Sequence, residues 1–325
     1  MDLYYPFLKQ GLKLFAPGGR FGKLQILLYH RVLLERDPLR PWEVTRKQFD
    51  EQMQTLSKYY QVLSLPDAMH RLYEGRLPAQ AVCITFDDGY EDNVSVAMPI
   101  LLKYGLPATF FIATGFLQGD IMWNDKIIES IRQYTGKDLD LTDLNLGHYL
   151  TTTMEQKSEA VQQILNQIKH KTPRERNTVV QEIGAKAKAS FKPLMMNSRG
   201  VSLLSQAGMD IGAHTVTHPI LNNLEFNDAK QEIQQSKNTL ENILQKKVKY
   251  FAYPNGYPGR DYNIKHCNLL KKIGFEYGFS TWWGAADPTM DQFQLPRFTP
   301  WDKTPLKFMF RMTQFRHNTK GQPVI

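Results

Sequence analysis

Short apolar segments alternate along this chain with longer amphipathic patterns, and only short turns separate them. The apolar segments have the length and composition of buried strands, and they cover residues 24–34, 61–65, 81–86, 108–113, 209–213, 248–252 and 277–281. The patterns between them predict helices over residues 45–59, 95–104, 201–207, 228–244 and 262–273. Because strands that alternate with helices usually pair in parallel, this order predicts an α/β fold built on a parallel sheet or barrel.

The alternation is interrupted between residues 118 and 193, where the chain becomes polar and helix-forming. Helices are predicted there over residues 154–170 and 174–191, with a break at Thr172 and Pro173. The region contains none of the chemistry-bearing spacings found elsewhere, so we interpret it as a helical insertion between two barrel elements. The predicted organisation is an amphipathic segment at 1–23, a barrel at 24–302 that contains the insertion at 118–193, and a basic aromatic tail at 303–325.

The charge and the cysteine content bound the class of protein. The 325 residues carry a formal net charge of +8, which favours anionic surroundings. Lys and Arg are dispersed, and zinc-finger and glycine-rich phosphate motifs are absent from the sequence, so nucleic acid is not an expected partner. The two cysteines, Cys83 and Cys267, leave a disulfide open without requiring an oxidising compartment.

The two ends of the chain bear on location. Residues 1–15 lack the apolar core and cleavage site of a secretory signal, and no run reaches the ~20 apolar residues that span a bilayer. We therefore expect a cytoplasmic protein. Residues 1–15 and 306–315 mix aromatic and aliphatic side chains with Lys and Arg, which suits peripheral contact with an anionic membrane at its cytoplasmic face. The alternative is that both segments pack on the barrel.

The strand predicted at 81–86 ends in two adjacent carboxylates, Asp87 and Asp88, followed by a glycine. Neighbouring carboxylates repel each other, and at a strand end they lose part of the water that would screen them. A lysine, a helix N-terminus or a metal ion would offset that cost.

Two histidines four residues apart, His214 and His218, follow the strand predicted at 209–213. If the chain turns helically after His214, both imidazoles point the same way and can share one cation. With an oxygen from Asp87 or Asp88, they form a two-histidine, one-carboxylate set suited to zinc or another divalent transition metal. The alternative is a pair of surface or capping histidines.

Three further features are ambiguous by themselves. The loop FAYPNGYPG at residues 251–259 is either a structural turn or a hydrolase loop that offers a backbone N–H to an oxyanion and stacks Tyr253 and Tyr257 on a sugar. His30, in the segment LLYHRV, is either a core histidine or a catalytic one. Arg297, in LPRF, either pairs with a carboxylate or is solvated.

Three of these motifs, taken in order, resemble the first three motifs of the polysaccharide deacetylases, which are carbohydrate esterase family four. They are TFDDGY at 85–90, HTVTH at 214–218 and FAYPNG at 251–256. The resemblance covers most of residues 24–298 apart from the insertion. It implies a distorted (β/α) barrel, a divalent metal and hydrolysis of N-acetyl groups from amino sugars.

The resemblance also implies roles for single residues. Asp87 is similar to the family's catalytic base, and Asp88, His214 and His218 are similar to its metal ligands, with zinc as the expected metal. The backbone N–H of Asn255 would face the oxyanion.

This chain departs from the family pattern at two positions. An arginine often opens the third motif and holds the base, whereas this chain has Ala252, so Arg297 would have to supply the cation from another strand. No C-terminal leucine-x-histidine is present to provide the general acid. In the permuted subgroup that resembles poly-N-acetylglucosamine deacetylases, an N-terminal strand supplies this histidine, which assigns the role of acid to His30.

The expected activity is therefore metal-dependent N-deacetylation of a polysaccharide or a lipid-linked glycan. The open alternatives are a catalytically silent carbohydrate-binding protein on the same barrel and a hydrolase of non-sugar amides. The sequence leaves the glycan, the metal and the oligomeric state open.

Overall fold

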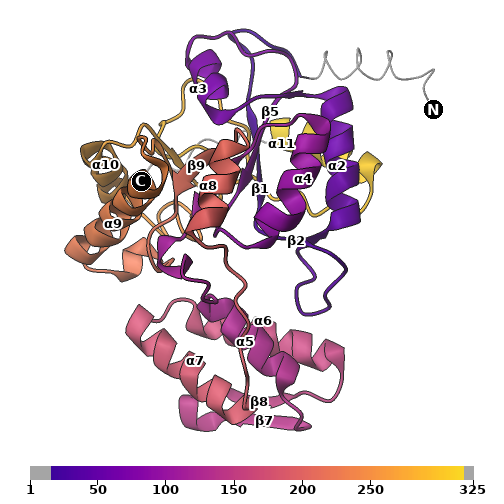
Figure 1. Cartoon of the computed structure of the whole chain (residues 1–325), viewed down its shortest axis with the longest axis vertical. Helices are drawn as coiled ribbons and strands as arrows, with labels where there is room; N and C mark the ends of the chain where they lie inside the picture. The colour runs from indigo at the N-terminus through magenta and orange to yellow at the C-terminus, as the bar shows by residue number, and fades with distance from the viewer. Residues whose placement is uncertain (1–15, 318–325) are drawn as a thin grey trace.

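The computed structural model describes residues 16–317, and within them the main sheet has seven strands. Six follow the order β1 (Gln25–Tyr29), β5 (Ala81–Phe86), β6 (Thr109–Ile112), β9 (Asp210–Ala213), β10 (Tyr250–Ala252) and β11 (Tyr277–Phe279), and β4 (Gln61–Val62) also pairs with β5. These pairings are parallel, as the alternation predicted (Figure 1). Two short strands outside this sheet, β2 (Val32–Leu33) and β3 (Val44–Thr45), pair with each other.

The two ends of the sheet are bridged by the segment that contains Arg297. Leu295 forms a parallel bridge to Phe279 of β11, and Phe298 forms one to Leu27 of β1. The sheet therefore curls into the distorted barrel that the sequence predicted, and Arg297 lies on the segment that completes it.

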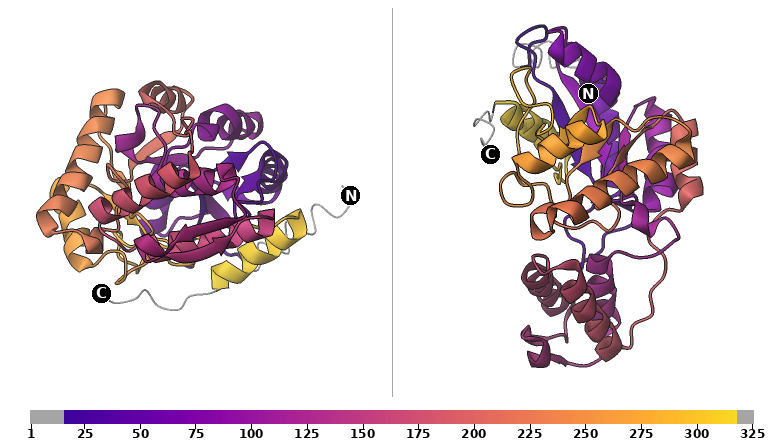
Figure 2. Two further views of the ribbon diagram at one scale, coloured as in Figure 1. Left: turned by 90° about the horizontal axis from the view of Figure 1, so that it is seen from below. Right: turned by 90° about the vertical axis from the view of Figure 1, so that its left-hand side faces the viewer.

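Helices surround this sheet, as two further views of the molecule show (Figure 2). They are α2 (Arg46–Tyr59), α3 (Leu65–Tyr73), α4 (Met98–Tyr104), α8 (Ser198–Gln206), α9 (Phe226–Leu244) and α10 (Ile264–Ile273). Local sequence explains their ends. Thr45 caps α2 through a capping box with Gln48. Gly105 and Gly274 end α4 and α10 in the left-handed conformation that a residue without Cβ adopts readily.

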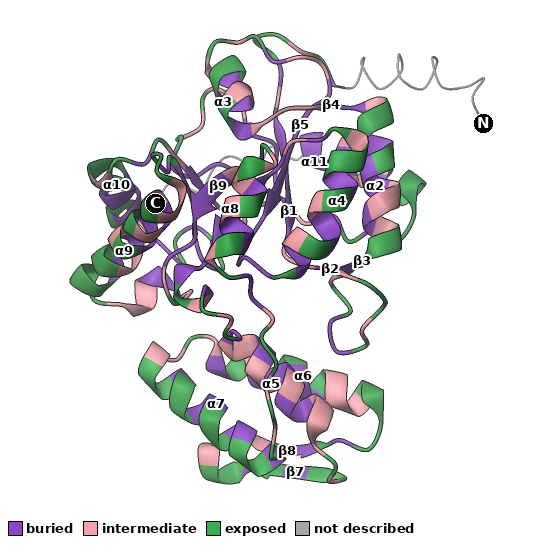
Figure 3. Cartoon of the chain, in the orientation of Figure 1, coloured by how far each residue is buried: buried purple, intermediate pink, exposed green. Residues whose placement is uncertain are grey.

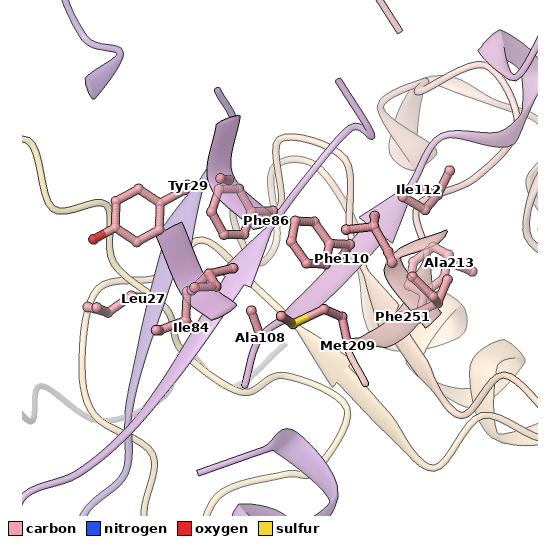
Figure 4. Close-up of a cluster of buried hydrophobic side chains, with 14 of the residues drawn as sticks. Leu27, Tyr29, Ile84, Phe86, Ala108, Phe110, Ile112, Met209, Ala213 and Phe251 are labelled. Atoms are coloured by element: carbon pink, nitrogen blue, oxygen red, sulfur yellow. The ribbon is translucent and has the colours of Figure 1, made fainter. Parts of the chain in front are cut away.

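The core between sheet and helices is apolar and aromatic. In Figure 4, side chains of consecutive strands meet in one cluster, in which Phe86 stacks on Phe110 with ring centroids 4.7 Å apart. Cys83 and Cys267 are both free and buried in the fold, so the disulfide left open by the sequence does not form.

The insertion forms a lobe with its own core below the barrel in Figure 1. It comprises α5 (Trp123–Gln133), the antiparallel hairpin β7 (Asp138–Leu141) and β8 (Gly147–Leu150), α6 (Met154–Ile168) and α7 (Pro173–Ala187). The last two helices match the prediction, whereas α5 and the hairpin were not predicted. The burial pattern in Figure 3 shows purple faces turned inward between these helices.

The segment expected as a C-terminal tail forms α11 (Pro305–His317), which packs on α2 and β1. Phe308, Met312 and Phe315 are buried, while Leu306 and Phe310 are exposed. Part of the apolar surface proposed for membrane contact here is thus core, because its spacing places one helix face against the barrel, while the contact with a membrane itself stays a prediction. Residues 1–15 lie outside the described residues, and no helix within 16–317 has the length and apolar character needed to cross a bilayer.

Candidate active site

The candidate residues converge where the parallel strands end. Asp87 and Asp88 follow β5, His214 follows β9 and His30 follows β1. Together with Asn255, they line a cavity of about 370 Å³, which we call the strand-end cavity. In parallel α/β folds, ligands bind at this edge because side chains from different strands meet there.

Asp88, His214 and His218 form a cluster with the geometry of a metal site. The Oδ1 atom of Asp88 lies 3.4 Å from Nε2 of His214 and 3.3 Å from Nε2 of His218. One ligand atom from each residue lies within 4.8 Å of the others. Within the described residues, Asp88 Oδ1 is buried without a hydrogen-bond partner. A buried carboxylate oxygen without a partner is costly, so this cluster fits a divalent cation.

The hydrogen bonds of His214 also fit a ligand role. Its Nδ1 lies 2.7 Å from the carbonyl oxygen of Ala252. A proton on Nδ1 donates to that oxygen and leaves the Nε2 lone pair directed at the cluster, which is the arrangement typical of metal-binding histidines. Ala252, where an arginine was expected, thus positions a ligand through its backbone.

Burial and charge set the protonation of the cluster. Burial lowers the pKa of His218 to about 4, so its imidazole is neutral and able to bind a cation near pH 7. Burial also acts to lower the pKa of His214, but the charges of Asp87 and Asp88 outweigh it and raise that pKa. For Asp88, burial opposes ionisation, yet His218 and His214 hold its pKa well below the usual range.

The chain does not form the helical turn that was considered after His214. Thr215 and His218 adopt positive φ angles of 64° and 55°, so the loop bends through left-handed residues instead. The carboxylate of Glu232 on α9 stabilises this shape by accepting the backbone N–H groups of Val216 and Thr217, each at 2.8 Å. The two imidazoles still meet, but a strained loop brings them together rather than a helix face.

Asp87 forms a bidentate ion pair with Arg297. Nη1 and Nη2 of Arg297 each lie 2.7 Å from one carboxylate oxygen of Asp87. Arg297 is fully buried, and it also donates to the Ser280 carbonyl at 3.1 Å and the Thr85 hydroxyl at 3.2 Å. Burial opposes ionisation of Asp87, but Arg297 outweighs it and lowers the pKa of Asp87 below its usual value. Arg297 thus pairs with Asp87 as expected, although it lies on the bridging segment rather than on a strand, and its role in positioning a catalytic base stays a prediction.

His30 lines the strand-end cavity directly after β1, the strand that pairs with β5. It is half-buried, and its carbonyl oxygen accepts a hydrogen bond from Asn93 at 2.9 Å. Glu43 lines the same cavity and accepts the Arg31 N–H at 3.1 Å. Burial raises the pKa of Glu43, and the charge of His30 opposes that shift. Glu43 was not predicted, because it lies in a connection without a periodic pattern.

The aromatic loop contributes less than expected. Asn255 lines the strand-end cavity and has a φ of 57°, which turns the backbone there. Tyr253 was predicted to stack on a sugar, but its position in the core leaves no exposed face for that contact. It is fully buried, stacks on Tyr262 with centroids 3.7 Å apart and donates to the Phe293 carbonyl. Tyr257 is exposed and packs edge-on against Trp282, and it is not among the described residues that line the cavity.

The insertion closes part of the same cavity, which the sequence did not predict. Its lining includes Trp123 and Asn124 of α5, Leu165 and Asn166 of α6, and Lys169 directly after α6. One feature of the sequence could have indicated this contact between the insertion and the barrel: Asp125, a carboxylate on the apolar face of α5.

Asp125 connects the insertion to the barrel through buried polar contacts. It accepts the Tyr90 hydroxyl at 2.8 Å and the Arg40 guanidinium at 2.7 Å. Tyr90 belongs to the same motif as Asp87 and Asp88. Buried polar contacts of this kind hold the insertion and the barrel in one relative position.

Solved structures share this architecture. The Streptococcus pyogenes deacetylase PplD in complex with acetate superposes with a TM-score of 0.61 at 22% identity, over 89% of this chain and 98% of that one. IcaB from Ammonifex degensii superposes with a TM-score of 0.57 at 18% identity, over 91% and 97% of the two chains. At these identities the comparison establishes the fold.

Sequence relatives extend the comparison. YxkH of Bacillus subtilis, which is named for the polysaccharide deacetylases, is 26% identical over 85% of this chain and 70% of its own length. The poly-β-1,6-N-acetyl-D-glucosamine N-deacetylase of Staphylococcus aureus is 23% identical over 80% of this chain and 68% of its own length. A sequence model described as polysaccharide deacetylase matches residues 74–278, which is more than half of the chain. The chain therefore belongs to the polysaccharide deacetylase family.

Proposed function

We propose that this protein is a zinc-dependent hydrolase that removes N-acetyl groups from amino sugars of a polysaccharide or a lipid-linked glycan. The observation that carries the proposal is the meeting of two sets of groups in one cavity. One set is the cluster of Asp88, His214 and His218; the other is the ionised, arginine-bound carboxylate of Asp87. Family membership and the name of the staphylococcal relative support the same substrate class.

The chain's own groups suit amide hydrolysis. A divalent cation held by Asp88, His214 and His218 would polarise the acetyl carbonyl and acidify a water molecule. Asp87 then takes a proton from the attacking water, and Arg297 keeps its carboxylate ionised and oriented. The backbone N–H of Asn255 donates to the oxygen that becomes negative. His30 donates a proton to the leaving amine.

Two alternatives make different predictions. A silent carbohydrate-binding protein would need neither the ligand cluster nor the ionised Asp87, so both features count against it. A hydrolase of non-sugar amides would keep both. Trp42 and Trp123 line the strand-end cavity, and aromatic side chains of this kind are ones on which sugars stack, which favours the glycan.

The test of the metal site is direct. Purified protein dialysed against zinc is expected to hold one equivalent by elemental analysis, and His218→Ala is expected to lose that stoichiometric binding because one ligand of three is removed. His70→Ala, which removes an exposed histidine that pairs with Glu74 on α3, is the matched control and should keep the metal. Full metal content in both His214→Ala and His218→Ala would contradict the assignment.

A catalytic role of His30 as general acid can be distinguished from a structural role by comparing substrates with different leaving groups. His30→Ala is expected to release acetate from N-acetylated oligosaccharides about 10²–10⁴-fold more slowly, because an amine leaves only when protonated. An aryl acetate has a leaving group that needs no proton, so the variant should hydrolyse it nearly as fast as the wild type. Equal losses on both substrates would indicate that His30 is a packing residue.

A further inference from the structure

A second cavity, of about 330 Å³, lies between the insertion and the barrel. We call it the arginine cavity. The barrel contributes Phe116 and Thr217 to its walls, while the insertion contributes Lys126 of α5 and Arg176 of α7. Its volume is in the range of ligand sites in proteins.

Arg176 is the unusual member of this cavity. Its side chain is only 3% exposed, yet it makes no ion pair or hydrogen bond within residues 16–317, and its Nε is buried without an acceptor. Its guanidinium stacks on the Trp123 ring, 4.6 Å from the centroid. Burial lowers the pKa of Arg176 to about 10, which leaves it charged at neutral pH. A buried cation without a counter-ion is costly to a fold.

The surrounding charges offset Arg176 only in part. The charge of Glu232 acts to raise the pKa of Arg176 but is outweighed by burial, and the Glu232 carboxylate already accepts the backbone N–H groups of Val216 and Thr217. Asp120, an acid on the cavity wall, lies 3.6 Å from Lys126 and is half exposed. The cavity therefore keeps an excess positive charge from Arg176.

The arginine cavity adjoins the strand-end cavity. Trp123 lines both cavities, and its indole N–H is buried without an acceptor in the described part of the chain. Thr217, next to the ligand His218, lines the arginine cavity. A ligand with one sugar at Asp87 and the next beyond Trp123 would present its neighbouring group to Arg176.

We propose that the arginine cavity binds an oxyanion, a phosphate or a carboxylate, carried by the substrate next to the N-acetyl sugar. The inference rests on the proposed deacetylation and adds a requirement for an anionic glycan. The planar guanidinium of Arg176 suits both oxyanions, since each offers two oxygens to its paired N–H groups.

Binding of inorganic phosphate, measured by calorimetry at low ionic strength, tests the cavity without catalysis. Wild type is expected to bind at one saturable site, and Arg176→Met is expected to bind at least about tenfold more weakly. Arg176→Lys should retain part of the affinity because it keeps the charge. Arg174→Met is the matched control: Arg174 is exposed on the same helix, and its loss should leave binding unchanged. His214→Ala, which disrupts the proposed zinc site, should still bind phosphate at the arginine cavity.

Phosphate affinity that is equal in wild type and Arg176→Met, or that disappears in His214→Ala, would overturn the proposal. Thermal unfolding of the Arg176→Met variant distinguishes a structural role of Arg176 from a role in binding an anion. Replacing an unpaired buried cation by an apolar side chain should leave the melting temperature unchanged or raised. A lower melting temperature with full phosphate affinity would show that Arg176 serves packing against Trp123.

Acetate release from three matched N-acetylglucosamine oligosaccharides identifies the source of the anion. One is neutral, one carries a phosphate on the neighbouring sugar and one has a neighbouring uronic acid. The wild type is expected to prefer one anionic substrate by about tenfold or more in kcat/KM, and Arg176→Met should lose that preference. Equal kcat/KM values for the three oligosaccharides would contradict the proposed anion site but not the proposed deacetylation. No acetate from any of them contradicts the deacetylase proposal, while the phosphate measurement still decides the cavity.

Discussion

Asp87→Asn is expected to slow acetate release about 10²–10⁴-fold while zinc stays bound. Asparagine keeps the shape of the side chain but has no carboxylate to accept the proton of the attacking water. The proposed ligand cluster of Asp88, His214 and His218 does not include Asp87, whose Oδ2 lies 3.8 Å from Nε2 of His214. The measurements are the initial rate of acetate release and the zinc content of the same preparation.

The same substitution leaves Arg297 without its carboxylate, so folding must be checked in parallel. Arg297 keeps its hydrogen bonds to Ser280 and Thr85 in this variant, which should hold the guanidinium in place. Asp67→Asn, in an exposed pair with Arg71, is the control for the loss of one carboxylate. A folded, zinc-loaded Asp87→Asn protein with a near wild-type rate would show that another group is the base.

Arg297→Met is expected to lower the free energy of unfolding by about 3–5 kcal/mol, because it removes one partner of a buried ion pair and leaves the charge of Asp87 unpaired. Both side chains are almost fully buried, with 0% and 3% exposed. Chemical denaturation of metal-free protein measures the change. Arg71→Met is the matched control, since its pair with Asp67 is exposed on both sides and should contribute no more than about 1 kcal/mol.

The pair also predicts a pH dependence. The pKa of Asp87 is lower in the folded state than its usual value, so the pair's stabilisation is present above the unfolded pKa, about 3.9, and is lost as the pH falls through the folded value. The stability gap between wild type and Arg297→Met should therefore be widest near pH 7 and shrink below about pH 4. Adding Asp87→Asn to Arg297→Met should recover part of the loss, because no unpaired buried charge remains. A gap that stays constant with pH would argue against the ion pair as its cause.

The sequence by itself determined the fold class and the chemistry-bearing positions. Apolar segments of strand length that alternate with amphipathic helices can bury their surfaces only as a parallel sheet covered by helices. The side chains that follow the strands then gather at one edge of the sheet. Asp87, Asp88, His214 and His218 could therefore be assigned to one site from the sequence alone. The helix ends at Thr45 and Gly105 are likewise local features, because caps depend on a few neighbouring residues.

Local spacing misled the prediction in two places. The bend after His214 depends on hydrogen bonds that the backbone of Val216 and Thr217 donates to Glu232, which lies on a separate helix, so the helical turn considered there did not form. Tyr253 follows β10 directly and looked like a surface aromatic, yet the neighbouring Tyr262 and Phe293 enclose it. Burial is a property of the whole packing arrangement rather than of a short segment.

Only the tertiary structure decided how the site is completed. Closure of the barrel brings Arg297 against Asp87 across 210 positions of sequence, a pairing that the sequence raised only through the family resemblance. Packing of the insertion brings Trp123 and Lys169 to the strand-end cavity and places Arg176 beside it. Alternation and capping act between neighbouring residues and can be recognised in a pattern, whereas an ion pair or a cavity wall depends on which distant surfaces fold together.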